Sequence, residues 1–322
     1  MTDWRHVLEV LYDLGDAWIS LYRLGQSSRL GPERLAQAIE EIETRGQHIE
    51  KSPHGLRLTR PVALDAHLIE RRLKVERVGR NVICFNEVAS TNDVAFDAAR
   101  QQGDADGLAV FAEKQRKGRG RLGREWSSPP RANVLMSMLL VDEELPHEPL
   151  TIAAGLACAE AIESMFNVHP KLKWPNDVLI DGDKVAGVIV ETRRIARRRC
   201  IVVGIGINVN AKPETPTDSR VTCLADHAHT PIERTELCAA LLARLDHWVT
   251  KIKYHQADDL HKAWLERCDM INTRISVVCK GRSYVGRVLD IDPMRGLCLC
   301  LDSGVNIRLE AAYSSIQKTS LP

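Results

Sequence analysis

The first 65 residues combine one clear helical pattern with a turn-rich end. Apolar side chains recur every three or four positions between residues 32 and 45: Leu35, Ala38, Ile39 and Ile42. Pro32 at the start and Gly46 just past the end are typical helix boundary signals. The run 51–61 is rich in turn formers and short alternating stretches, which favours two small strands. Helices followed by a strand pair predict a winged helix-turn-helix over residues 1–65.

Residues 66–270 mix strand-like and helix-like patterns. Apolar and β-branched runs predict strands near 82–85, 108–113, 134–140 and 201–210. An alanine-rich apolar segment over 150–166 predicts a buried helix. A segment of this length is sufficient for one packed α/β core. From 271 to 322, short alternating runs separated by glycine and turn residues predict a small β-barrel.

Composition places the chain among soluble globular proteins of more than one domain. It has 322 residues, 44% hydrophobic content, and 44 basic against 43 acidic residues, a formal net charge of +1. These values exclude a disordered chain, a collagen and a coiled coil. Since DNA and anionic membranes attract proteins with a large positive surplus, near-neutrality argues against a protein that coats either.

The cysteines and the apolar runs indicate a cytoplasmic protein with reduced thiols. The nine cysteines are odd in number and scattered, without a C-x-x-C pair, so neither a zinc site nor a disulfide framework is expected. Charged residues as early as Arg5 and Glu9 interrupt any signal-peptide core. The longest apolar windows, 134–141 and 150–162, are too short to span a membrane. We therefore expect no metal site and no membrane partner.

The most unusual segment is a basic, glycine-rich run over residues 114–124. It holds six basic residues and three glycines with no acidic residue. Glycines permit tight turns and unneutralised cations repel one another, so we expect a mobile loop that orders around a multiply charged anion, such as a phosphate-bearing ligand. A solvated basic loop, or an RNA-binding arm of the Arg-Gly type, explains the run equally well. A P-loop is excluded because its G-x-x-x-x-G-K-[ST] pattern is absent.

A hairpin is predicted at Asp181-Gly182, which lies between two apolar runs. Folding back at this turn brings Lys184 alongside Asp177, with Asn176 just beyond, so a cation and two polar groups converge. The commoner fate of such residues is an exposed lysine beside a turn Asn-Asp pair. The adjacent Trp174-Pro175, unusual in an exposed strand, favours a site instead.

The strand expected over 201–210 carries Gly204, Gly206 and Asn208 at alternate positions. A face without side chains lets a flat ligand lie against the backbone, and Asn208 at its end can read a base or a carbonyl group. Paired glycines also occur where strands merely cross closely. The preceding run, 193–199, has five arginines in seven positions and is interpreted as the solvated tip of a hairpin.

Residues 86–93 are polar and lie between a predicted strand and a predicted helix over 94–100. Serine, threonine, asparagine and aspartate are N-cap residues, so helix initiation explains them. The functional alternative is that Ser90, Thr91 and Asn92 bind a small polar ligand at the start of the helix.

Together these four segments resemble the biotin protein ligases. The family's Gly-Arg-Gly-Arg-x-Gly-Arg-x-Trp loop stands at 118–126, its Lys-Trp-Pro-Asn-Asp motif at 173–177, its Lys-x-x-Gly-x-x-x-Glu strand at 184–191 and its Gly-x-Gly-x-Asn strand at 204–208. Their order and spacing agree as well. The resemblance covers nearly the whole chain and implies an α+β protein. Its expected parts are a winged helix-turn-helix over 1–65, as in the bifunctional ligase/repressor subgroup, a mixed-sheet catalytic domain like that of class II synthetases over 66–270, and an SH3-like barrel over 271–322.

The resemblance implies a two-step reaction. Biotin and ATP form biotinyl-5′-adenylate, and biotin then passes to a lysine of the biotin carboxyl carrier protein of acetyl-CoA carboxylase; Mg²⁺ accompanies ATP. Because a carboxylate that attacks the α-phosphate brings two anions together, fixed cations must neutralise the developing charge. We assign that catalytic role to Arg119 and Lys184, and Asp177 is expected to orient the acceptor lysine.

The implied binding residues form two overlapping sets. Biotin is expected to contact Ser90, Thr91, Asn92, Gln115, Gly118, Arg119, Gly120, Arg121, Lys184, Gly187, Gly204 and Gly206. ATP or the adenylate is expected to contact Arg119, Arg121, Arg124, Trp126, Asn176, Lys184 and Asn208. Closure of the loop, helped by Arg121, protects the mixed anhydride from water.

Two other hypotheses use the same residues. A lipoate–protein ligase of the same fold also makes an acyl-adenylate, and a biotin-sensing transcription factor would use the adenylate only as a corepressor. The subgroup further implies a homodimer, and operator DNA as a partner of the N-terminal domain. The helix between Gly31 and Gly46, however, has four glutamates against two arginines, a net charge of −2, which argues against DNA contact. A vestigial or dimer-stabilising domain is the alternative.

Overall fold

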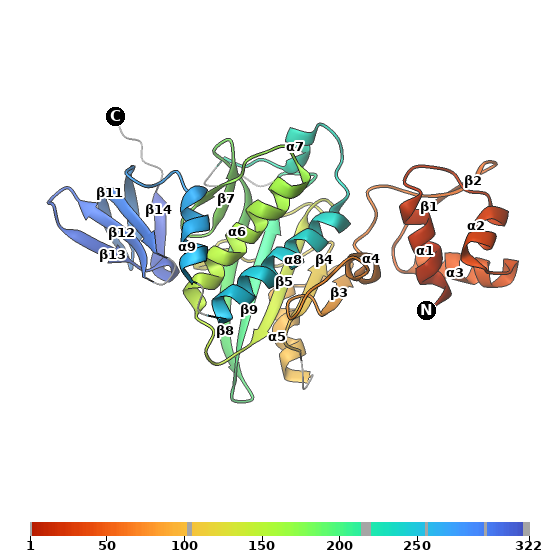
Figure 1. The fold of residues 1–322 in the computed structure, drawn as a ribbon, viewed down its shortest axis with the longest axis horizontal. Helices are drawn as coiled ribbons and strands as arrows, with labels where there is room; N and C mark the ends of the chain where they lie inside the picture. The colour runs from red at the N-terminus through yellow and green to blue at the C-terminus, as the bar shows by residue number, and fades with distance from the viewer. Residues whose placement is uncertain (1, 102–104, 214–219, 255–256, 293–294, 318–322) are drawn as a thin grey trace.

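The computed structural model of the protein describes residues 2–101, 105–213, 220–254, 257–292 and 295–317. Within these ranges the strands form three separate sheets, of two, five and seven strands. Figure 1 shows them spread along the longest axis of the molecule, with the seven-stranded sheet in the middle and one small sheet at either end.

The N-terminal unit consists of three helices and a hairpin: α1 (Asp3–Asp13), α2 (Leu21–Ser28), α3 (Pro32–Thr44), β1 (Ile49–Ser52) and β2 (Gly55–Leu58). α3 confirms the helix expected over 32–45. Its apolar stripe lies in a core that belongs to this unit: Leu35, Ala38, Ile39 and Ile42. The unit therefore has a hydrophobic core separate from that of the central sheet.

The central sheet has the strand order β3-β4-β5-β9-β8-β7-β6. Its strands are β3 (Asn81–Phe85), β4 (Leu108–Ala112), β5 (Val134–Val141), β6 (Lys171–Lys173), β7 (Asp177–Ile180), β8 (Asp183–Ile195) and β9 (Arg198–Ile207). β3 and β4 pair in parallel and the other neighbours are antiparallel, so the sheet is mixed, as expected. The strands predicted near 82–85, 108–113 and 134–140 are confirmed. The strand expected over 201–210 begins earlier, at Arg198, and ends at Ile207.

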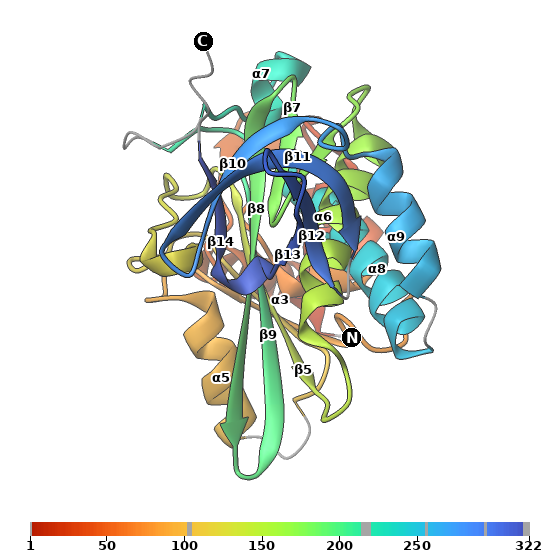
Figure 2. The ribbon, with the colours of Figure 1, turned by 90° about the vertical axis from the view of Figure 1, so that its left-hand side faces the viewer.

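Helices cover both faces of the central sheet (Figures 1 and 2). The helices of this central unit are α4 (Ala66–Glu70), α5 (Thr91–Gln101), α6 (His147–Met165), α7 (Leu224–Ala228), α8 (Arg234–Lys253) and α9 (Ala257–Glu266). Alternate residues of β4 divide between two cores: Ala109 and Phe111 face the core of α6 and α8, whereas Leu108 and Val110 face that of α5. α6 confirms the buried helix expected over 150–166, and α5 the helix expected over 94–100.

The C-terminal unit is a five-stranded antiparallel sheet in the order β13-β12-β11-β10-β14. Its elements are β10 (Arg274–Cys279), β11 (Arg282–Asp292), β12 (Gly296–Leu301), β13 (Asn306–Leu309), the short helix η2 (Ala311–Tyr313) and β14 (Ser314–Gln317). Val277, Val288 and Leu299 join the main core, so this sheet packs on the central unit. No helix in the described ranges is long and apolar enough to cross a membrane.

Two hairpins of the central sheet match their predicted turns. Asp181 and Gly182 have φ values of 51° and 82°, the left-handed conformation of a tight hairpin turn between β7 and β8. Ala196 and Arg197 turn β8 into β9 in the same way, and Figure 2 shows this hairpin extending beyond the rest of the sheet. Not every arginine near its tip is simply solvated, because the Arg193 guanidinium carbon lies 4.1 Å from the centroid of the Phe96 ring.

Candidate active site

A cavity of about 400 Å³ lies where the central sheet meets the C-terminal sheet. Most of the predicted site residues line it: Ser90, Thr91, Asn92, Gln115, Arg119, Gly120, Arg121, Arg124, Trp126, Asn176, Asp177, Lys184, Gly187, Gly204 and Gly206. Gly118 and Asn208 are not among the lining residues. Gly118 accepts a hydrogen bond from the Trp126 amide at 3.0 Å, and the buried Asn208 side chain donates to the Thr222 carbonyl at 3.1 Å. The tertiary structure thus gathers four segments that are far apart in the sequence.

Glycines of β8 and β9 form the floor of the cavity. A Cβ atom on Gly206 would lie 2.3 Å from the Trp126 ring, and one on Gly187 would lie 2.9 Å from it. A Cβ atom on Gly204 would lie 2.6 Å from Asn92 Oδ1. The glycines therefore permit the close approach expected of a flat group. In this structure the group on Gly206 and Gly187 is the indole of Trp126.

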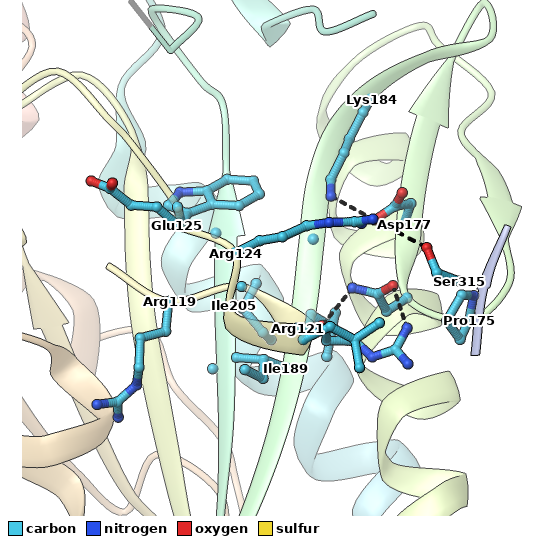
Figure 3. Close-up of a pocket in the computed structure, with 18 of the residues that line it drawn as sticks. Arg119, Arg121, Arg124, Glu125, Pro175, Asp177, Lys184, Ile189, Ile205 and Ser315 are labelled. Carbon is cyan, nitrogen blue, oxygen red and sulfur yellow. Dashed lines mark hydrogen bonds and ion pairs between the residues drawn. The ribbon is translucent and has the colours of Figure 1, made fainter. Parts of the chain in front are cut away.

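Lys184 and Asp177 form the central ion pair of the cavity, with Nζ 2.6 Å from Oδ1 and both side chains largely buried (Figure 3). The turn at Asp181-Gly182 places β7 beside β8, and a bulge between Val178 and Leu179 shifts the register there. The Lys184 ammonium also lies 5.5 Å from the centroid of the Trp126 ring. A fixed cation between an aromatic ring and a carboxylate is well placed to meet a ligand phosphate.

Arg121 and Arg124 connect the basic loop to the C-terminal sheet. Arg121 donates to Asn176 Oδ1 at 3.1 Å and to the Ser314 carbonyl at 3.1 Å, and it also contacts the Ala311 carbonyl. Burial lowers the pKa of its guanidinium, with Arg124 adding to that effect and Asp177 opposing it. Arg124 donates to Ser315 Oγ at 3.1 Å.

The last strand supplies part of the cavity wall that sequence reasoning missed. Residues 314–317 of β14 line the cavity opposite the central sheet. Nothing in their short polar sequence, Ser-Ser-Ile-Gln, signals a ligand site. They reach the cavity because β14 pairs with β10 at the edge of the C-terminal sheet.

Arg119 lies on the other side of the cavity from Lys184. Its guanidinium makes a two-pronged ion pair with Asp93 at 2.9–3.0 Å and a further contact with Glu191 Oε2 at 3.0 Å. Figure 3 shows the side chain pointing away from Lys184 and Asp177. The structure therefore does not bring the two predicted catalytic cations together, and a catalytic role for Arg119 stays a prediction.

The start of α5 forms the polar end of the cavity. The Thr91 amide donates to Gln115 Oε1 at 2.8 Å, and Asn92 Nδ2 donates to Glu191 Oε2 at 2.7 Å. Ser137 of β5 lies below them, with its hydroxyl 2.6 Å from Thr91 Oγ1. Sequence reasoning assigned no role to Ser137 or Glu191. The signal for Ser137 was a single hydroxyl in an otherwise apolar strand.

Thiols and metal clusters contribute nothing to this cavity. Burial raises the pKa of Cys84, Cys158 and Cys238, which keeps these thiols protonated at neutral pH. No cysteine is among the lining residues. Over the part of the chain that the structure describes, no group of three His, Cys, Asp or Glu residues could hold a metal ion.

Sequence comparison agrees with a ligand-activating enzyme of this fold: the chain belongs to the biotin/lipoate A/B protein ligase family, whose signature matches residues 84–208. It is similar to the bifunctional ligase/repressor BirA of Bacillus subtilis, with 30% identity over 94% of this chain and 95% of that protein. It is also similar to the biotin–[acetyl-CoA-carboxylase] ligase of Mycobacterium tuberculosis, with 32% identity over 72% of this chain and 90% of that protein. Among solved structures, the biotin protein ligase from Aquifex aeolicus in complex with biotin and ATP superimposes with a TM-score of 0.64 and 26% identity, covering 74% of this chain and 100% of the other.

Proposed function

We propose that the protein is an ATP-dependent biotin–protein ligase. It joins biotin to ATP as biotinyl-5′-AMP with release of pyrophosphate, and then transfers the biotinyl group to a lysine of the biotin carboxyl carrier protein with release of AMP. The observation that carries the proposal is one glycine-floored cavity that combines the Lys184–Asp177 pair with the basic loop, in a chain similar over most of its length to biotin ligases.

The first step needs positive charge at the attacked phosphate. As a carboxylate oxygen of biotin bonds to the α-phosphorus and pyrophosphate leaves, negative charge accumulates on the phosphate oxygens. Lys184 supplies a cation held by the β7–β8 hairpin, and a phosphate oxygen competes with Asp177 for it. Arg119 takes part in this step only if its guanidinium leaves Asp93 and binds the ligand instead.

The second step needs a lysine amine beside the adenylate. Asp177, the first residue of β7, orients the acceptor lysine. Asn176 accepts a hydrogen bond from Arg121 and so helps to hold the basic loop in place. The amine nitrogen attacks the biotinyl carbonyl carbon, so that the C–N amide bond forms and the C–O bond to the phosphate breaks. AMP leaves with the electron pair of that bond, and the proton of the amine passes to solvent. Arg121 and Arg124 hold the basic loop against the C-terminal sheet, which excludes water from the anhydride.

The binding residues follow the predicted sets. The Trp126 indole, which lies on Gly187 and Gly206 in this structure, leaves them when the ligand binds. Biotin then contacts the start of α5 and the glycine floor: Ser90, Thr91, Asn92, Gln115, Gly187, Gly204 and Gly206. The basic loop and Lys184 contact the nucleotide phosphate, Trp126 stacks on adenine and Asn208 reads its edge. Gly118 shapes the base of the loop. Mg²⁺ enters with ATP as the counter-ion of the substrate phosphates.

Carrier labelling tests the proposal directly. Purified full-length protein is incubated with ATP, radiolabelled biotin and a biotin carboxyl carrier domain. We expect ATP-dependent label on the carrier, and none when its acceptor lysine is replaced by arginine. An unlabelled carrier together with activation of lipoate would identify a lipoate–protein ligase of the same fold instead.

Three domains fit the observed sheets. We assign residues 1–65 to a winged helix-turn-helix, 66–270 to the catalytic domain and 271–322 to an SH3-like barrel. The separate core of the N-terminal unit and the five-stranded C-terminal sheet support these boundaries. Residues 318–322 lie outside the described part of the chain. A homodimer is the expected assembly.

Repressor activity is a second function that the name of the Bacillus relative raises. We expect no tight operator binding, because α3 and its C-cap carry Glu33, Glu40, Glu41 and Glu43 against only two arginines. Arg34 pairs with Asp3 at 2.7 Å, and Arg45 pairs with Glu41 at 3.1 Å. Titration of labelled biotin-operon DNA, with biotin and ATP at fixed salt, measures this. Tight, sequence-dependent binding would establish operator DNA as a partner and overturn this expectation.

A further inference from the structure

Asn92 lies at the polar end of the cavity between two groups that hold its side-chain amide. The residue is almost fully buried. Its Nδ2 donates to Glu191 Oε2 at 2.7 Å, and its Oδ1 accepts from the Ser137 hydroxyl. Glu191 and Ser137 are outside the cavity lining, whereas Asn92 is part of it.

Glu191 determines which end of this amide faces the cavity floor. An ionised carboxylate only accepts hydrogen bonds, so the amino group of Asn92 must face Glu191 and its oxygen must face the other way. The Ser137 hydroxyl is the donor toward both Asn92 Oδ1 and Thr91 Oγ1, the latter 2.6 Å away, and the Thr91 hydroxyl itself donates to Gln115 Oε1 at 3.1 Å. The amide is therefore fixed at both ends.

The oxygen of Asn92 is directed toward the glycine floor. It lies 2.6 Å from the position that a Cβ atom on Gly204 would occupy. An amide oxygen has two acceptor sites, and Ser137 uses one of them. The Asn92 amide thus covers Gly204 itself, and its second acceptor site is available to an N–H group of a ligand that lies beside it in the cavity.

We propose that Glu191 is a positioning residue that makes Asn92 present a hydrogen-bond acceptor to a ring N–H of the biotin ureido group. The inference rests on the proposed biotin ligase function and adds a source of ring selectivity. A site built to accept a hydrogen bond from a ligand N–H disfavours a ring without one, because the buried acceptor is then left unpaired. The dithiolane ring of lipoate has no N–H group.

Substitution of Glu191 tests this arrangement in the full-length protein. Glu191→Ala frees the Asn92 amide to turn its amino group toward the floor, and we expect the biotin Kd to rise about 10- to 100-fold by isothermal titration calorimetry. Glu191→Gln keeps a carbonyl acceptor for Asn92 and should restore part of the affinity. In Glu191→Ala the KM for ATP should change less than about threefold. Any pyrophosphate exchange that lipoate supports should not decrease in this variant, although its affinity for biotin does.

Two further variants separate this role from the ion pairs around it. Glu143 lies outside the cavity and pairs at 3.1 Å with Arg194, which belongs to the same hairpin as Glu191. Glu143→Gln removes this carboxylate and should leave the affinity for biotin unchanged. Asp93→Asn weakens the hold on Arg119 without touching the Asn92 amide. An equal loss of biotin affinity in Asp93→Asn and Glu191→Ala would assign the effect to Arg119 and overturn the proposal.

The remaining outcomes are distinct. A Glu191→Ala biotin Kd within about threefold of wild type, in an enzyme that labels its carrier, overturns the role of Glu191 and leaves the ligase function intact. A parallel rise in the ATP KM and drop in melting temperature shows general damage and also overturns it. A wild-type protein that neither binds nor activates biotin overturns the ligase function and this inference together.

Discussion

The lysine and arginine side chains that line the cavity already have protein partners, so a ligand phosphate must compete with these partners. Lys184 faces Asp177, Arg121 faces Asn176 and two backbone carbonyls, and Arg119 faces Asp93 and Glu191. A phosphate offers more negative charge than any of these partners, and a charge-assisted bond to it is correspondingly stronger. When a cationic side chain leaves its protein partner for the phosphate, its position changes, so ligand binding is coupled to the positions of these side chains.

Lys184→Ala should abolish most adenylate formation while the protein still folds. Loss of a cation aimed at the developing charge lowers the rate by about 10²- to 10³-fold. Biotin-dependent exchange of labelled pyrophosphate into ATP measures the first step alone. Lys280→Ala is a matched control, because Lys280 pairs with Glu310 at 2.8 Å on the C-terminal sheet. Wild-type exchange in Lys184→Ala would remove this lysine from the mechanism.

At the scale of elements, the basic loop is a small folded unit. The Trp126 amide donates to the Gly118 carbonyl at 3.0 Å, and the Gly120 amide donates to the Arg124 carbonyl at 2.7 Å. The short helix η1 (Arg121–Gly123) forms the tip. The sequence predicted a mobile run of cations. In this structure the run is closed on itself and tied to β14, since the carbonyls and hydroxyls of that strand accept from its arginines, and its mobility stays a prediction.

Gly118→Ala should open the base of this loop. A Cβ atom there would lie 2.2 Å from the Trp126 carbonyl oxygen, so the backbone at the base of the loop must move and the hydrogen bond from the Trp126 amide to the Gly118 carbonyl must lengthen. We expect pyrophosphate exchange to fall about tenfold or more, because misplaced binding groups lose their alignment. The melting temperature should change little, since residues 122–125 at the tip of the loop are exposed. Gly31→Ala, where no atom lies within 4 Å of the new Cβ, is the control. Unchanged exchange in Gly118→Ala would contradict this account of the loop.

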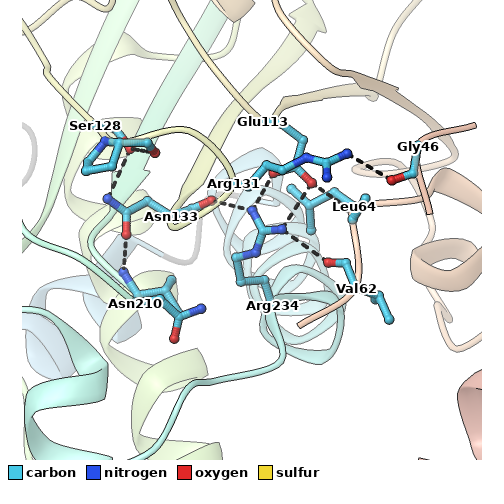
Figure 4. A network of polar contacts seen from close by, with 12 residues as sticks. Gly46, Val62, Leu64, Glu113, Ser128, Arg131, Asn133, Asn210 and Arg234 are labelled. Carbon is cyan, nitrogen blue, oxygen red and sulfur yellow. Dashed lines mark hydrogen bonds and ion pairs between the residues drawn. The ribbon is translucent and has the colours of Figure 1, made fainter. Parts of the chain in front are cut away.

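For the whole molecule, one buried ion pair joins the N-terminal segment to the central sheet (Figure 4). Arg234 and Glu113 lie 2.5 Å apart and are almost fully buried. Arg234 also donates to the Val62 carbonyl at 3.1 Å, and Glu113 accepts from the Leu64 amide at 2.7 Å. The pair thus holds the chain segment that leads out of the N-terminal unit.

Arg234→Met should destabilise the protein, because it leaves the Glu113 carboxylate buried without its cation. Breaking a buried pair in this way costs about 3–5 kcal/mol, measured as the free energy of unfolding in urea. The double variant Arg234→Met with Glu113→Leu should recover much of that loss, since no unpaired charge remains. A single-variant loss below about 1 kcal/mol would show that the pair does not hold the junction.

Local patterns predicted much of this fold and most of the cavity lining. The apolar spacing of α3, the alanine-rich run of α6 and the turn at Asp181-Gly182 depend on neighbours within a few positions, so the sequence alone shows them. The long helix α8 was not predicted; its buried residues include the charged Arg234 and Asp246 as well as apolar ones. The short polar strand β14 also carries no periodic signal.

The sequence by itself determined the helices and strands of clear period, the hairpin that pairs Lys184 with Asp177, and the supply of cations and glycines for an adenylate site. The tertiary structure decided which partner each group meets. Arg119 meets Glu191 from 72 positions away, and Arg121 meets Ser314 from 193 positions away. Such contacts depend on sheet order and on the packing of the C-terminal unit, neither of which is encoded in local spacing. Only the folded chain therefore shows that Arg119 belongs to the polar end of the cavity and Lys184 to the other.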